Sequence, residues 1–151
     1  MFRASRGLAF ALTFAACSVV TAPAVPFRHI GSGAFSAFSE QQVVVVRSAA
    51  EWETAQRQLG FGLHDAPRAI DFASEAAVIV ALGTRPTSGY TVQVDEVRRR
   101  NGRYEVIAVE LTPGSCATAQ VLTTPFEVIA IPRDADRVDV SWSSRARGAC
   151  D

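Results

Sequence analysis

The chain alternates short apolar runs with clusters of turn-forming residues, a pattern typical of a small domain built mostly from strands. Four consecutive valines at 43–46 predict a first strand, because β-branched side chains favour extended backbone. The entirely apolar run 76–82 predicts a strand buried on both faces. Alternating or β-branched segments predict four more strands, at 90–98, 103–112, 126–131 and 137–142.

A single helix is predicted between the first two of these strands. Ser48 and Glu51 have the spacing of a capping box, and Gly60 follows as a C-terminal stop. Three apolar side chains share one face of this helix: Trp52, Ala55 and Leu59. We therefore expect a helix over 48–59 that packs this face on the sheet.

Two turn signals indicate how the strands connect. Asn101-Gly102 favours a two-residue type I′ turn and therefore a hairpin. Val97 falls out of the alternation that precedes it, which predicts a bulge near Asp95-Glu96. Together the elements predict an α+β fold: a single small domain with a mostly antiparallel sheet of about six strands, which could curl towards a barrel, and one N-terminal helix packed on it.

Charge and composition exclude several classes of chemistry. The chain carries 15 basic and 15 acidic residues, so its net charge is zero and it lacks the basic footprint of a nucleic-acid-binding protein. Every basic residue is Arg, and the absence of Lys excludes a Schiff base, a P-loop or a Ser-Lys dyad. No glycine-rich phosphate motif occurs, and the His and Cys residues lack metal-ligand spacing. We expect no cofactor, no bound metal and no small-molecule substrate.

The candidates for a catalytic site are few. Ser88 lies in Pro-Thr-Ser-Gly-Tyr, which differs from the Gly-x-Ser-x-Gly nucleophile elbow. The two histidines are His29 and His64, and a Cys116–His64 dyad competes with the disulfide that Cys116 could form. The residues therefore predict a binding or structural domain and not an enzyme.

The N-terminal residues have the features of an export signal. Arg3 and Arg6 form a positive region, and 8–16 is an apolar stretch too short to span a bilayer. The small residues before Cys17 resemble the lipobox of bacterial lipoproteins. This resemblance implies a signal peptide of residues 1–16 and lipidation of Cys17.

Two features leave the processing site open. Phe14 stands where Leu is usual in a lipobox, and Ala22-Pro23-Ala24 offers an ordinary cleavage site after Ala24. Both alternatives predict an exported protein, either a membrane-anchored lipoprotein of the bacterial envelope or a periplasmic or secreted form. Residues 17–41 lack clear periodicity and predict a flexible tether to the domain.

Two of the three cysteines remain for the folded domain. Because Cys17 is either lipidated or removed, Cys116 and Cys150 form an even pair in an oxidising compartment. A disulfide between them would fasten the C-terminus and stabilise the domain by roughly 3–4 kcal/mol in the chain-entropy model. The alternative is two free thiols.

The turn-rich octapeptide at 83–90 is the strongest candidate for a binding site. It leaves the buried strand and combines Pro, Gly, hydroxyl, Arg and Tyr side chains, which suits a rigid and exposed loop. The predicted partner-binding loop consists of Thr84, Arg85, Pro86, Thr87, Ser88, Gly89 and Tyr90. In this interpretation Pro86 and Gly89 set the loop shape.

The roles of individual side chains remain as alternatives. Arg85, Thr87 and Tyr90 are the predicted contacts to a protein partner. Tyr90 is also inward by alternation, so the competing interpretation is a core residue beside an ordinary turn. Asp71 precedes the buried strand and is either a turn cap or a hydrogen-bonding support for the loop.

The order of these motifs resembles the C-terminal domain of the PrcB family, which are envelope lipoproteins associated with a protease complex. The matching residues are Asp71-Phe72, Val78-Ile79-Val80 with Gly83, Arg85-Pro86-Thr87-x-Gly89-Tyr90, Thr112-Pro113-Gly114 with Cys116, Thr123-Thr124-Pro125-Phe126 and Val128-Ile129-Ala130-Ile131-Pro132. The resemblance covers about residues 70–132, and Ser88 stands where the family pattern has Gly. It implies a PrcB-like α+β domain over 42–151 and a non-catalytic accessory subunit that binds and stabilises a protease complex.

A second resemblance implies a different function. Pro86-Thr87-Ser88-Gly89-Tyr90 is similar to the Asn-Pro-Thr-Thr-Gly-Tyr loop of chagasin-type cysteine-protease inhibitors. Arg85 replaces the Asn, no Arg-Pro-Trp loop follows, and an immunoglobulin-like inhibitor does not need the helix at 48–59. The alternatives to an accessory subunit are therefore a loop inhibitor of a cysteine protease and an envelope binding domain unrelated to proteases.

Overall fold

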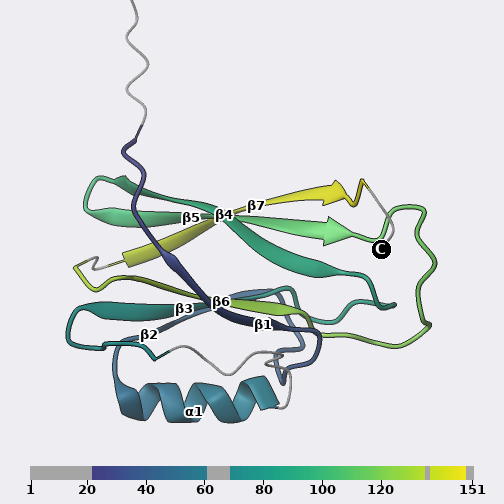
Figure 1. Ribbon diagram of the computed structural model, residues 1–151, viewed down its shortest axis with the longest axis horizontal. Coiled ribbons are helices and arrows are strands. Elements are labelled where there is room, and N and C mark those ends of the chain that lie inside the picture. Colours follow the sequence, from purple (N-terminus) through teal and green to yellow (C-terminus); the bar gives the residue numbers. More distant parts are fainter. Residues whose placement is uncertain (1–21, 61–68, 135–136, 149–151) are drawn as a thin grey trace, which may run out of the picture.

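Seven strands and one helix are present in the computed structural model, which describes residues 22–60, 69–134 and 137–148. The elements in chain order are β1 (Arg28–Gly33), β2 (Gln42–Val46), α1 (Ala49–Leu59), β3 (Glu75–Ala81), β4 (Thr91–Arg100), β5 (Arg103–Thr112), β6 (Phe126–Pro132) and β7 (Arg137–Ala146). They stack as three layers, with one sheet between the other sheet and the helix (Figure 1).

Each sheet has its own strand order. The four-stranded sheet has the order β1-β6-β3-β2 and is antiparallel throughout. The three-stranded sheet has the order β4-β5-β7, with an antiparallel β4–β5 pair and a parallel β5–β7 pair. The predicted α+β class with a mostly antiparallel sheet and one helix is confirmed. The strands of the described residues form two open sheets and no closed barrel.

The helix forms where the capping residues predict it. The Ser48 hydroxyl accepts a hydrogen bond from the Glu51 N–H at 3.3 Å, and the Glu51 carboxylate accepts one from the Arg47 N–H at 2.7 Å. The first bond satisfies a backbone donor that the first helical turn leaves unpaired, and the second ties the residue before the N-cap to the helix. Ala55 and Leu59 are buried, so the predicted apolar face does pack on the sheet.

The β4–β5 hairpin also follows its local sequence. Asn101 and Gly102 have φ angles of 51° and 75°, and both central positions of a type I′ turn require positive φ. The register of β4 shifts between Val94 and Glu96, so the predicted bulge is confirmed.

Residues 28–33, which the sequence assigns to the tether, form β1 in the structure. β1 pairs with β6, and Ile30 on β1 is buried. Upstream, Ala24 pairs with Arg98 on β4, so the N-terminal part of the chain contacts both sheets. The polar, glycine-rich sequence of β1 has no strand periodicity, so local sequence does not predict this strand. It forms because β6 is buried and pairs with a strand on each side.

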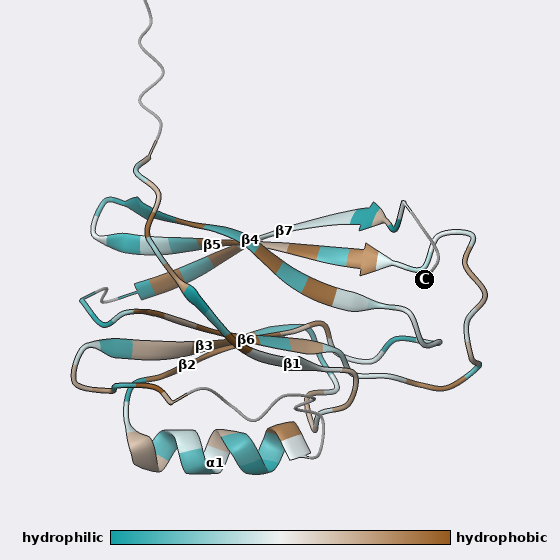
Figure 2. Ribbon diagram, in the orientation of Figure 1, coloured by the Kyte–Doolittle hydropathy of each residue, from teal (hydrophilic) through white to brown (hydrophobic). Residues whose placement is uncertain are grey.

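Two apolar cores flank the central sheet. β3 contributes to both, because its alternate side chains face the other sheet or the helix. Ala76, Val78 and Val80 lie in the core between the sheets, and Ala77, Ile79 and Ala81 lie in the core beneath α1. The prediction of a strand buried on both faces is confirmed, and Figure 2 shows the hydrophobic colouring of β3 and β6.

The predicted export features cannot be placed in this fold. Residues 1–21, with the signal region and Cys17, lie outside the described residues. Within the described ranges, no helix combines the length and the apolar character needed to cross a membrane.

Candidate functional site

The predicted loop at 83–90 lies at one end of the sandwich, beside a second loop. Residues 83–90 connect β3 to β4, and residues 113–125 connect β5 to β6. The pairing of these strands brings both connections to the same end, and Figure 1 shows them extending beyond the sheets. We call the two segments together the double loop and this end of the molecule the loop end.

The double loop begins at Gly83, a position that only glycine can occupy. Gly83 has φ +76°, and an added Cβ would lie 2.6–2.8 Å from backbone atoms of residues 39–41. The next residue, Thr84, donates hydrogen bonds to the Ser39 carbonyl from its N–H at 3.0 Å and its hydroxyl at 3.2 Å. The start of the loop is therefore packed against the residues that precede β2.

Arg85 is committed to contacts within the domain. Its backbone pairs with Thr123 in both directions, at 2.7 and 2.9 Å, and this joins the two segments of the double loop. Its guanidinium forms a bidentate pair with Glu110 on β5, with the Nε–Oε1 distance at 2.7 Å. Only about a fifth of each side chain is exposed, 20% for Arg85 and 19% for Glu110. Arg85 is therefore placed to stabilise the loop more than to reach a partner.

The centre of the loop is bonded to residues 119–123. The buried Thr123 hydroxyl donates to the Thr87 carbonyl at 3.1 Å. Ser88 donates its N–H to the Ala119 carbonyl at 3.0 Å, and its hydroxyl accepts from the Ala119 N–H at 2.9 Å. The backbone and hydroxyl groups of the octapeptide thus hold the double loop together, whereas Pro86 is exposed.

The end of the octapeptide is close to the start of the second segment. Gly89 has φ +92°, and an added Cβ would lie 3.0 Å from Cβ of Pro113 and 3.1 Å from Cγ2 of Thr118. Tyr90 is half-buried and belongs to neither of the two core clusters. It therefore matches neither alternative fully, because part of its ring is covered and part remains accessible.

Sequence reasoning missed an apolar pair in the second segment. The exposed large hydrophobic side chains among the described residues are Phe35 at 53%, Val121 at 43% and Leu122 at 66%. Val121 and Leu122 lie between the contacts of Ala119 and Thr123 with the octapeptide. Their signal in the sequence is an apolar dipeptide in a turn-rich stretch with no predicted strand. Exposed apolar residues at a rigid loop are candidates for a protein contact.

Phe35 lies on a segment bonded to the double loop. The Thr124 N–H donates to the Ala34 carbonyl at 2.9 Å, and the Ser36 N–H donates to the Thr124 hydroxyl at 2.6 Å. The segment containing Phe35 therefore runs beside the end of the double loop. All three exposed large hydrophobics of the described residues lie on segments that meet at the loop end.

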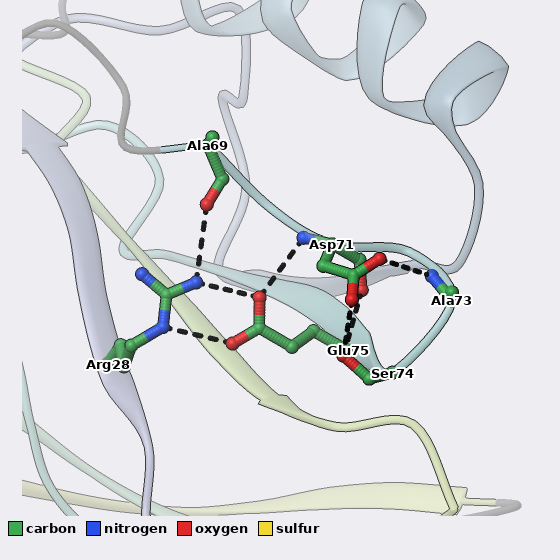
Figure 3. A network of polar contacts seen from close by, with 6 residues as sticks. All are labelled: Arg28, Ala69, Asp71, Ala73, Ser74 and Glu75. Carbon is green, nitrogen blue, oxygen red and sulfur yellow. Dashed lines mark hydrogen bonds and ion pairs between the residues drawn. The ribbon is translucent and has the colours of Figure 1, made fainter.

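Asp71 belongs to the opposite end of the sandwich. Its carboxylate accepts hydrogen bonds from the Ala73 N–H at 3.0 Å and the Ser74 hydroxyl at 2.8 Å, as Figure 3 shows. These bonds hold the pKa of Asp71 below its usual value, because they favour the charged form. Asp71 is thus a turn cap before β3 and, through these contacts, does not support the octapeptide.

Charged residues surround Asp71 at this opposite end, which we call the charged end. Arg28 on β1 forms a bidentate pair with Glu75 at the start of β3 (Figure 3). Arg99 and Tyr104 both donate to Asp134, and Arg103 is paired with Asp139. The hydrogen bond from Arg28 lowers the pKa of Glu75. The Arg28, Arg99 and Arg103 side chains are about half exposed, whereas Tyr104 is buried, so the ion pairs of the three arginines add little stability individually.

One buried carboxylate joins the two sheets. Glu127 on β6 accepts a hydrogen bond from the Val94 N–H at the β4 bulge, at 2.5 Å, and its other oxygen lies 2.5 Å from Nδ1 of His29. Burial raises the pKa of Glu127, because desolvation disfavours its charged form. His29 thus pairs with Glu127, whereas the Ser88 hydroxyl is bonded to the Ala119 N–H, and His64 lies outside the described residues.

The cysteine predictions are tested only in part. Cys116 lies in the second segment of the double loop and is disulfide-bonded. Cys150 lies outside the described residues, so its identity as the partner stays a prediction. Among the described residues, no group of three His, Cys, Asp or Glu side chains could hold a metal ion.

Comparison with known protein families gives a match to part of the chain. Residues 76–132 match the family model described as PrcB C-terminal. The span runs from β3 to β6 and includes the whole double loop, so the predicted PrcB resemblance is confirmed for this part of the chain. No curated protein and no solved structure matches.

Proposed function

We propose that the chain is a non-catalytic, exported envelope protein that serves as an accessory subunit binding and stabilising a protease complex. The observation that carries this proposal is the PrcB C-terminal match over residues 76–132. An accessory role in association with a protease complex fits that family in general. The double loop, which lies within the matched span, is the proposed binding site.

Rigidity of the double loop supports a binding role. Arg85, Thr87 and Ser88 are held by backbone or side-chain hydrogen bonds to residues 119–123. A loop that is ordered before it meets its partner loses less conformational entropy on binding. The same bonds would be needed in a loop with a purely structural role, so the argument also needs an exposed contact surface.

Val121 and Leu122 provide that surface. Apolar side chains that are exposed on a rigid support lose little entropy when a partner covers them, and covering them removes apolar surface from water. Leu122 is the more exposed of the two. We assign Val121 and Leu122 the main contacts to the partner, a role that the sequence suggested for Arg85, Thr87 and Tyr90, and we place the exposed Pro86 beside them.

The proposed location of the protein rests on the sequence of its N-terminal residues. Lipidation of Cys17 would anchor the domain in the envelope, and cleavage after Ala24 would release it. Ala24 pairs with Arg98 on β4, so the chain joins the folded domain seven residues after Cys17. A lipid anchor would thus hold the domain near the membrane surface.

Deletion of the gene for this chain in its native cells tests the proposed function. A stabilising subunit predicts that the amount and activity of its protease both fall, while transcription of the protease gene is unchanged. A rise in cysteine-protease activity would instead identify the chagasin-like inhibitor. Unchanged abundance and activity of every envelope protease would contradict both and leave an envelope binding domain unrelated to proteases.

A further inference from the structure

A separate surface lies at the outer edge of β2, away from the double loop. β2 is a terminal strand of its sheet, and within the described ranges its strand partner is β3 alone. In an antiparallel pair, every second residue directs its N–H and C=O away from the neighbour. The outer edge of β2 therefore carries backbone donors and acceptors in the spacing that another strand would match.

The other edges differ from β2 in how they are protected. Residues 23–25 cover part of the β4 edge, where the Val25 N–H donates to the Val97 carbonyl at 2.7 Å. β7 carries charges along its length, at Arg137, Asp139 and Arg145, which discourage pairing. β1, the other terminal strand of the four-stranded sheet, carries Arg28 and has an irregular register between His29 and Gly31. β2 has the sequence QVVVV and no charge. An uncharged, β-branched edge is the kind that accepts an added strand.

A hollow of about 430 Å³ lies beside β2 on the side of α1. Its walls are formed by three strand residues and five helix residues: Val44, Val45, Val46, Ala50, Glu51, Thr54, Ala55 and Gln58. The helix side stays open because Ala50, Thr54 and Ala55 are small. Val44 and Val46 belong to the core beneath α1, so this is the face on which alternate side chains of an added strand would lie.

We propose that β2 and α1 form a strand-addition site for an extended, uncharged segment of a partner protein. The backbone of the segment pairs with the outer edge of β2, and β-branched or small apolar side chains at alternate positions fill the hollow. Backbone pairing supplies affinity, and the hollow selects the side chains. The site goes beyond the double loop and does not depend on the proposed function.

The helix surface favours a peptide segment over a second copy of the chain. Pairing two β2 edges around a two-fold axis would bring both α1 helices onto the same face of the joined sheet. The residues that α1 exposes beside the hollow are small or polar: Ala50, Glu51, Thr54 and Gln58. They provide no large apolar side chain for helix–helix packing, whereas a single strand needs only the hollow.

Binding of a defined peptide to the intact mature chain tests the site. The probe is a capped, fluorescently labelled heptapeptide of alternating threonine and valine. We expect saturable binding with a dissociation constant on the order of 100 μM, as for weak strand addition. Amide hydrogen exchange should slow at residues 43–46 on binding. The same peptide with N-methyl groups on alternate residues should not bind, because it lacks the donors.

A matched pair of variants locates the peptide in the hollow. Ala50→Phe fills the hollow from an exposed helix position, and should weaken binding at least about tenfold. Ala49→Phe makes the same change at the neighbouring exposed residue, which does not line the hollow, and should leave binding unchanged. Both variants should fold, because neither alanine is buried.

Several outcomes would overturn the proposal. One is the absence of saturable binding up to about 1 mM peptide. Another is an equal loss of peptide affinity in both phenylalanine variants. A third is slowed amide exchange at β7 instead of β2 when the peptide binds. Protection of residues 43–46 that depends on protein concentration without peptide would show that the occupant is a second copy. None of these outcomes affects the proposed role of the double loop.

Discussion

The two ends of the sandwich are built by different means. At the charged end, Arg28, Arg99 and Arg103 pair with acidic residues in solvent, and the Asn101-Gly102 turn has open space around it. At the loop end, backbone hydrogen bonds hold the double loop, and apolar side chains stay exposed. The charged end is thus a solvated surface, whereas the loop end is a rigid support for apolar side chains that are exposed among the described residues.

The largest difference in stability between the two ends should appear when one glycine at each end is replaced by alanine. Gly83 and Gly102 have nearly equal φ angles, +76° and +75°, but only Gly83 has backbone atoms where a Cβ would lie. Gly102→Ala should cost about 1 kcal/mol of unfolding free energy, from backbone strain alone. Gly83→Ala should cost about 3 kcal/mol or more, because residues 39–41 must also move. Urea denaturation of both variants measures the difference, and equal losses would refute the close approach.

A smaller contrast is expected between the ion pairs of the two ends. Arg85→Met leaves the half-buried Glu110 carboxylate unpaired and should cost about 1–2 kcal/mol of unfolding free energy. Arg28→Met removes a bidentate pair of similar geometry in a more exposed position. Arg28 is 42% exposed, against 20% for Arg85, so solvent screens its pair more strongly and Arg28→Met should cost less, about 0.5 kcal/mol. If both variants lose the same stability, Arg85 is not a structural element of the loop.

The buried carboxylate of Glu127 and the ion-paired carboxylate of Glu75 should change stability with pH in opposite directions. Because burial raises the pKa of Glu127 above its ordinary value of 4.5, the wild type loses stability as pH rises from 4.5 through the raised pKa. Glu127→Gln should therefore gain stability relative to the wild type over this window. Glu75 has a lowered pKa, so its contribution is lost as pH falls through that pKa, and Glu75→Gln should approach the wild type only in acid.

Unfolding free energies measured from about pH 2.5 to about pH 7 check both slopes, the Glu75 slope below about pH 4.5 and the Glu127 slope above it. The comparison uses each variant minus the wild type, so that titrations common to both cancel. A Glu127→Gln variant whose relative stability is flat or falls with pH would contradict the assignment of burial as the main influence on Glu127.

The smallest effect on stability should come from the proposed contact residues. Leu122→Ser removes an exposed side chain and should change the unfolding free energy by no more than about 0.5 kcal/mol. Calorimetry measures this change. A loss of several kcal/mol would show that Leu122 packs within the domain, and would remove it from the proposed binding surface.

Local sequence was sufficient for the elements that depend on neighbours in the chain. The Ser48–Glu51 cap, the Asn101-Gly102 hairpin, the β4 bulge and the doubly buried β3 all follow from short patterns. Each pattern specifies backbone conformation or burial directly, through capping bonds, positive φ or unbroken hydrophobicity.

Features that depend on distant partners were not predictable in this way. The sequence of β1 does not indicate that it pairs with β6, and nothing in β7 indicates a parallel pairing with β5. Arg85 likewise looked available for a partner, because its ion pair with Glu110 spans 25 positions of the chain. Strand partners and long-range ion pairs are chosen by the assembled fold, which a local pattern does not encode.

The central claim is that the loop end binds a protease-complex partner. The most direct test is a pull-down from the native cell envelope with the tagged mature chain, followed by mass spectrometry. The bait is compared with a Val121→Ser, Leu122→Ser double variant and with an Arg99→Ser, Arg100→Ser control at the charged end. The account predicts that wild type and control recover the same protease and that the double variant, folded to the same extent, does not. Equal recovery by all three baits would contradict it.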